Sequence, residues 1–195
     1  MDKCDLLDKT IQQKLEKYHD LNSIIIVQGL EGSKAKLFFF KKENNVFIKK
    51  FSFDALIGRD GMGKQIEGDM KTPVGDFSIT LLFGIKPDPG VKTNYLQVTE
   101  NHYVCCDDCR FYNQIIDAKA ENHKCDGEHL VKYVPHYNYA MAIDYNKENI
   151  YGKGTGIFIH CNGYKPYTLG CIAIPENDML TLIKEVDKDT KVCIF

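Results

Sequence analysis

The sequence predicts a mainly β fold, a β-rich sandwich or barrel-like domain with an N-terminal helix and a short C-terminal helix. Most apolar residues fall in short runs of strand length, separated by glycine, asparagine and aspartate. Helical spacing of apolar residues occurs only near the two ends of the chain. With 195 residues, 44% of them hydrophobic, the chain is long and apolar enough for one domain with a real core.

The individual elements follow from these patterns in chain order. Apolar residues recur at helical spacing over residues 2–19, which predicts the first helix, and again over 176–186, which predicts the second. The run over 35–53 is interrupted by Asn44 and Asn45, which predicts two strands joined by a turn. Further strands are expected at 23–29, 76–84, 94–100, 139–146, 156–160, 170–175 and 191–195, and a structured loop at 58–75. The stretch over 105–136 is polar and lacks periodicity.

Composition and charge exclude several classes of protein. The formal net charge of −2 argues against a nucleic-acid-binding protein, which needs a basic face. No apolar run approaches the roughly 20 residues that span a bilayer, so no integral membrane segment is expected. The N-terminus lacks the apolar stretch of a secretory signal, so we expect a cytoplasmic protein, or one that is exported by another route or after removal of a leader. Residues 1–22 are expected to form a helical appendage to a domain over 23–195.

A histidine and a cysteine near the C-terminus are the strongest candidates for chemistry. His160 ends one apolar strand and Cys171 begins another, so neighbouring strands can place an imidazole base beside a thiol. Gly170 permits the tight backbone turn that exposes a nucleophile. The alternative is a buried structural cysteine in a strand.

A second motif, GDMKTPVG at residues 68–75, leads into a predicted strand. With the strand that ends in His160 and the segment TLGC at 168–171, it resembles the catalytic domain of L,D-transpeptidases, the YkuD-like family. Carboxyl groups have a reference pKa of about 3.9, too low for a thiol base, so the 68–75 loop is expected to shape the site without doing chemistry. The resemblance covers about Leu56 to Val192 and includes subgroup features, namely GKGTGIFIH and the pairs Tyr112-Asn113 and Tyr145-Asn146.

The resemblance implies a curved β-sandwich, peptidoglycan stem peptides as substrate, and no cofactor or metal. It makes Cys171 the nucleophile and His160 the general base and acid, oriented by a backbone carbonyl. Thr168 occupies the family's usual serine position, and the N–H groups of Gly170 and Cys171 are the expected oxyanion donors. The substrate-binding candidates are Tyr112, Asn113, His136, Tyr145 and Asn146.

The implied activity is cysteine acyl transfer at an L–D peptide bond. A thioester on Cys171 would pass the acyl group to an amine, in cross-linking or D-amino acid exchange. The alternatives are an L,D-carboxypeptidase that hydrolyses muropeptides, and a non-catalytic cell-wall-binding or metal-stabilised module. Ala173 departs from the arginine of many members, which removes one expected contact to a substrate carboxylate. The acceptor amine and the oligomeric state do not follow from the sequence.

Eight cysteines are spaced irregularly, and a domain of this size does not need disulfides, so mostly free thiols are expected. Cys106 and Cys109 have the spacing of a zinc-ligand pair, and His123, Cys125 and His129 follow them. The second half of this cluster lacks a complete ligand pair, so we expect no stoichiometric metal. A disulfide between Cys106 and Cys109 is the alternative in an exported protein.

Overall fold

The structure is a computed structural model that describes the backbone from residue 3 onward and the side chains from residue 9 onward. Asp2, the first residue of the expected N-terminal helix, lies outside the described residues. From residue 3 the helix is present as α1 (Lys3–Lys17). No helix in the described part of the chain is long and apolar enough to cross a membrane.

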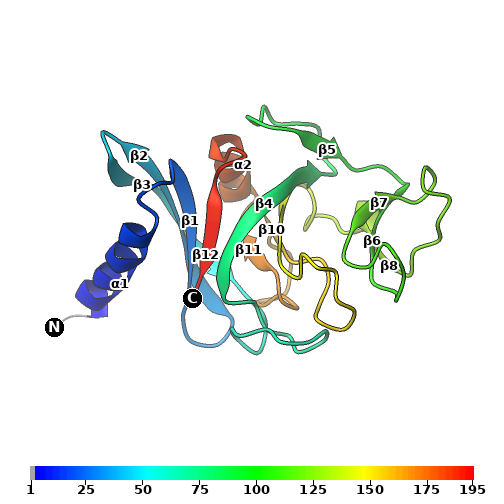
Figure 1. The fold of residues 1–195 in the computed structure, drawn as a ribbon, viewed down its shortest axis with the longest axis horizontal. Coiled ribbons are helices and arrows are strands. Elements are labelled where there is room, and N and C mark those ends of the chain that lie inside the picture. Colours follow the sequence, from blue (N-terminus) through cyan, green and yellow to red (C-terminus); the bar gives the residue numbers. More distant parts are fainter. Residues whose placement is uncertain (1–2) are drawn as a thin grey trace.

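A nine-stranded sheet forms the body of the molecule (Figure 1). Its order is β12-β1-β2-β3-β11-β10-β9-β4-β5, and β12 also pairs with β4, so the sheet closes on itself like a barrel. The predicted mainly β, barrel-like class is therefore confirmed. The strands are β1 (Ser23–Gly29), β2 (Lys34–Glu43), β3 (Val46–Leu56), β4 (Gly75–Gly84), β5 (Tyr95–Gln97), β9 (Ala140–Ile143), β10 (Phe158–Cys161), β11 (Ile172–Ile174) and β12 (Lys191–Ile194).

Two helices pack against this sheet on different faces. The α2 helix (Glu176–Glu185) buries Met179, Leu182 and Ile183 in the main core, which the barrel encloses. On the outer side, Ile11 of α1 packs with residues of β1 and β2, including Phe38. Lys17 at the end of α1 forms an ion pair with Asp76 of β4 (Nζ to Oδ2 2.6 Å). The division of the chain at residue 22 stays a prediction.

A small three-stranded sheet lies at the end of the molecule opposite α1 (Figure 1). It consists of β6 (His102–Cys105), β7 (Ile115–Asp117) and β8 (Gly127–His129), followed by the 3₁₀ turn Leu130–Lys132. The polar stretch over 105–136, for which no strand or helix was predicted, therefore contains short strands. These strands are three or four residues long and rich in Cys, His, Asp and Gly, so they carry no apolar alternation.

A second core cluster gathers side chains of both sheets. Phe83, Ala142 and Phe158 of the large sheet lie in it with Val104 of β6 and with Leu130. Strand β10 contributes to both cores, because Phe158 belongs to this second cluster while Ile159 and Cys161 belong to the main core. A side chain on the Phe158 face of β10 therefore points toward the space between the sheets.

Candidate active site

Strands β10 and β11 bring the predicted histidine and cysteine together. They pair in parallel, with Ile159 opposite Ile172 and His160 opposite Ala173. Continuing this register by one residue sets Cys171 opposite Phe158, and the Phe158 N–H donates to the Cys171 Sγ at 3.3 Å. Because side chains alternate along a strand, the thiol and the imidazole lie on the same face as diagonal neighbours.

The His160 ring is buried, with 6% of the residue exposed, and its orientation is fixed. Nδ1 lies 2.8 Å from the carbonyl oxygen of Cys161, which can only accept, so Nδ1 carries the proton. The other nitrogen, Nε2, is then free of a proton and can act as a base. Tyr137 packs edge-on against the ring with centroids 5.6 Å apart. The carbonyl that the family resemblance implies for orienting this histidine is present.

The Cys171 thiol is held by backbone groups on either side. It donates to the carbonyl oxygen of Gly156 at 3.2 Å and accepts the N–H of Phe158. Among the described residues no hydrogen bond joins this sulfur to His160. A turn of the thiol away from Gly156 must therefore precede proton transfer to the imidazole.

Burial keeps both groups neutral in the resting protein. It lowers the pKa of His160 to about 4, although the hydrogen bond to the Cys161 carbonyl opposes the shift. Burial raises the pKa of Cys171 to about 12, although the N–H of Phe158 opposes that shift. At neutral pH the pair is thus a thiol and an imidazole, not a thiolate and an imidazolium.

Two threonines anchor the backbone carbonyl of the candidate nucleophile. Thr168 Oγ1 donates to the Cys171 carbonyl oxygen at 2.6 Å, and Thr72 Oγ1 lies 3.3 Å from the same oxygen. The N–H of Gly170 donates to Thr168 Oγ1 at 3.1 Å, so this expected oxyanion donor is already engaged. Gly170 has a φ of 149°, a region that favours glycine. Within the described part of the chain, no turn or loop hydrogen bond takes up the Cys171 N–H, which is the donor next to the sulfur.

The loop at 58–75 contains a buried ion pair that sequence analysis missed. Lys64 Nζ lies 3.0 Å from Asp69 Oδ1, with the side chains only 2% and 13% exposed. Burial opposes ionisation of Asp69, but three backbone N–H donors and Lys64 outweigh it and lower the carboxyl pKa to about 2. A Cβ placed on Gly170 would lie 3.8 Å from Lys64 Nζ, so this ammonium lies beside the nucleophile's turn. The only sequence signal was a lysine inside a glycine-rich loop.

Two of the substrate-binding candidates, Tyr112 and Asn113, hold the loop that precedes β10. The Tyr112 hydroxyl accepts the N–H groups of Gly152 and Gly154 at 3.1 and 3.3 Å. Asn113 Oδ1 accepts the N–H of Gly156 at 2.9 Å, and it is the Gly156 carbonyl that accepts the Cys171 thiol proton. These contacts give the pair a supporting position behind the nucleophile, and their contact with substrate stays a prediction.

Two further candidates, Tyr145 and Asn146, belong to the same loop. The Tyr145 hydroxyl donates to the Lys153 carbonyl at 2.7 Å, and the Asn146 amide donates to the carbonyl oxygens of Ile150 and Gly154, both at 3.0 Å. A cavity of about 420 Å³ adjoins this loop. Its lining includes Asn113, Tyr145 and Phe158 but neither His160 nor Cys171.

His136, the remaining candidate, lies beside the candidate base. Its ring packs edge-on against His160 with centroids 5.7 Å apart. A Cβ on Gly163 would come within 2.2 Å of His136 Nε2, so the loop after β10 passes directly over this ring. Burial, together with the charge of Lys165, lowers the pKa of His136.

The cysteines depart from the expectation in one place. Cys105 and Cys125 form a disulfide, and the expected alternative pair, Cys106 and Cys109, are both free thiols. The other described free thiols are Cys161, Cys171 and Cys193. Cys4 lies outside the residues whose side chains are described.

Comparison with known families identifies the family to which this fold belongs. The model of the L,D-transpeptidase catalytic domain, YkuD, matches residues 23–194. The chain belongs to the YkuD family. The matched model is that of a catalytic domain, so the chain carries an enzyme domain of the YkuD family. A comparison with curated proteins gives no match.

Several solved structures are similar to this chain. Bd1075 from Bdellovibrio bacteriovorus is 17% identical with a TM-score of 0.50, over 90% of this chain and 48% of that one. A variant of the helical cell shape determining protein Pgp2 from Campylobacter jejuni is 22% identical with a TM-score of 0.49, over 89% of this chain and 47% of that one. An L,D-transpeptidase mutant from Enterococcus faecium is 16% identical with a TM-score of 0.42, over 89% and 50%. The chain thus spans about half the length of these proteins.

Proposed function

We propose that this chain is a cysteine acyl-transferase that cleaves an L–D peptide bond of a peptidoglycan stem tetrapeptide. The observation that carries the proposal is the parallel β10–β11 register, which sets Cys171 beside an oriented, unprotonated His160 Nε2. The choice of a stem peptide as substrate rests on membership of the YkuD family. The proposed chemistry needs no cofactor. We place the work of the enzyme at the cell wall.

The first half-reaction begins from the neutral pair. The thiol leaves the Gly156 carbonyl, its proton moves to His160 Nε2, and the sulfur attacks the carbonyl carbon of the L-centre. The C–N bond then breaks as the imidazolium returns the proton to the departing D-amino acid nitrogen. A thioester on Cys171 remains, and His160 is neutral again.

The N–H of Cys171 is the first donor available to stabilise the oxyanion of the transition state. Thr168 and Thr72 hold the carbonyl of the same residue, which fixes the direction of this peptide group. Gly170 contributes its N–H only if Thr168 Oγ1 releases it. Donors fixed before the reaction stabilise charge that develops in the transition state, which accounts for much of the rate in such sites.

The second half-reaction decides between transfer and hydrolysis. An amine that attacks the thioester gives its proton to His160 Nε2, and that proton returns to the sulfur as the C–S bond breaks. Water in place of the amine gives L,D-carboxypeptidase activity, the second candidate function.

The test uses two synthetic tetrapeptides that differ only in the chirality of the last residue, each incubated with a labelled D-amino acid. We expect mass spectrometry to show loss of the terminal D-residue and incorporation of the label. Equal cleavage of the L–L and L–D peptides would contradict the proposal. Loss of the D-residue without incorporation of the labelled D-amino acid would mean that water resolves the thioester, and the function would then be that of an L,D-carboxypeptidase.

A further inference from the structure

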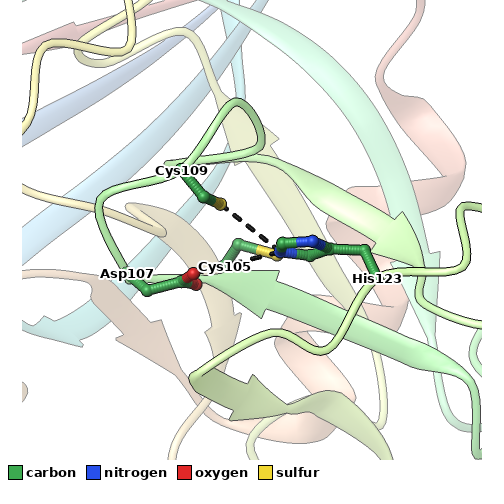
Figure 2. A group of neighbouring side chains, drawn as sticks. All are labelled: Cys105, Asp107, Cys109 and His123. Atoms are coloured by element: carbon green, nitrogen blue, oxygen red, sulfur yellow. Dashed lines mark hydrogen bonds and ion pairs between the residues drawn. The ribbon is translucent and has the colours of Figure 1, made fainter.

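A group of potential metal ligands gathers at one end of the small sheet. Figure 2 shows Cys105, at the end of β6, with Asp107 and Cys109 from the turn that follows and His123 from the segment before β8. One ligand atom of each lies within 4.8 Å of the others. The side chains come from two segments of chain and converge on one point.

The spacing within this group matches a tetrahedral zinc site. Cys109 Sγ lies 3.5 Å from His123 Nε2. Two such ligands on one zinc ion, at Zn–S of about 2.3 Å and Zn–N of about 2.0 Å, would lie about 3.5 Å apart. Phe111 packs against the His123 ring with centroids 5.0 Å apart, which fixes the direction of the imidazole.

Cys125 is the fourth ligand candidate through its bond to Cys105, and its own sulfur is not among the atoms that lie within 4.8 Å of one another. Its sulfur is bonded to that of Cys105, so a reduced chain has both thiols at this point. Cys106 does not belong to the set, because its thiol donates to the Val104 carbonyl and accepts the Thr155 hydroxyl. The ligand pair expected from sequence, Cys106 with Cys109, is therefore not the pair that meets. The sulfur that lies close to Cys109 and His123 is that of Cys105, not that of Cys106.

We propose that the reduced chain binds one structural zinc ion through Cys105, Cys109, His123 and Cys125. Three thiolates and one imidazole are a common set for closed structural zinc sites. Binding exchanges three thiol protons for the metal ion, and His123 enters as neutral imidazole. Asp107 stays outside the first shell, where its carboxylate, 3.9 Å from His123 Nε2, adds negative charge near the metal.

The disulfide is the oxidised form of two of these ligands. A dithiol reductant opens it in a two-electron step, in which the S–S bond breaks, two thiols form on the protein and the reductant becomes a cyclic disulfide. Zinc and the Cys105–Cys125 disulfide are therefore mutually exclusive states of one site. This replaces the expectation from sequence that the cluster holds no metal.

Either state holds the turn that supports the nucleophile. The N–H of Tyr112 donates to the Cys109 carbonyl at 3.1 Å, and the N–H of Asn113 donates to the Cys105 carbonyl at 2.9 Å. Asn113 in turn holds Gly156. The proposed site is thus a structural clamp on this turn, and it does not depend on which reaction Cys171 carries out.

The test measures metal in protein purified with a reductant and without chelator. We expect about one zinc ion per chain by elemental analysis and native mass spectrometry. After removal with a chelator, Co²⁺ should bind and give the absorption of thiolate-to-cobalt charge transfer. The single variants Cys109→Ser and His123→Ala should lose most of the zinc, and Cys106→Ser, the matched control from the same turn, should keep it.

Three results would overturn the proposal. They are absence of zinc and cobalt binding in wild-type protein whose thiols are shown to be reduced, zinc retained in both ligand variants, and zinc lost from the folded Cys106→Ser control. If a ligand variant fails to fold, the test uses wild-type protein from which the metal has been removed with a chelator. Re-addition of zinc must then protect the three cysteine ligands from alkylation, and equal labelling with and without zinc counts against the site.

Discussion

The buried, neutral imidazole of His160 predicts that the protein loses stability in mildly acidic solution. The folded-state pKa is about 4, against an ordinary value of 6.5. Between these values the unfolded chain binds a proton that the folded protein excludes, so the contribution is fully present above pH 6.5 and is lost as the pH falls toward 4. The interval of 2.5 pH units, at 1.36 kcal/mol per unit, corresponds to about 3 kcal/mol.

The assay is urea unfolding of wild type and His160→Asn over a pH series. Asparagine does not titrate, and its amide can still donate toward the Cys161 carbonyl. The stability difference between the two proteins should shrink by about 3 kcal/mol from pH 7 to pH 4. His19→Asn, at an exposed position, controls for removal of an imidazole. A difference that stays constant over this range would refute a buried neutral His160.

Further predictions concern the groups around the pair. Asp69→Asn leaves Lys64 buried without its partner, and should cost about 3–5 kcal/mol of unfolding free energy while changing kcat far less than His160→Ala does; an equal loss of kcat in a folded protein would argue against a supporting role. Asn113→Gly tolerates the positive φ of 62° but removes the side-chain contacts to the loop before β10, and should slow alkylation of Cys171. An unchanged alkylation rate would show that Asn113 does not support the position of the thiol. In a pH profile of acylation, the acid limb should lie near pH 4, and a midpoint near 6.5 would contradict the neutral pair.

The sequence sufficed for the elements whose residues carry their own pattern. Strand β1 contains a run of β-branched residues from Ile24 to Val27, and Asn44 and Asn45 occupy the turn between β2 and β3 with φ of 48° and 63°. Helix α2 begins at Glu176, the expected residue, and its apolar stripe starts at Met179. His160 and Cys171 were identified because each stands at the end of an apolar strand.

The features that sequence missed depend on contacts between distant segments. Strands β6, β7 and β8 are only three or four residues long, too short to show a strand pattern in the sequence, and their mutual pairing makes them a sheet. The Cys105–Cys125 disulfide joins two of these strands' ends, and no local spacing distinguishes Cys105 from Cys106. The burial of Lys64 likewise depends on its partner Asp69 and on the loop that folds over both.

The most direct test of the central claim is intact-mass spectrometry of the protein after reaction with a stem tetrapeptide, or with a carbapenem as an acylating probe. Wild type should gain one adduct, the folded Cys171→Ala variant should gain none, and Cys106→Ser should react as wild type does. An adduct that persists on Cys171→Ala would mean that another residue is the nucleophile, and would contradict the account.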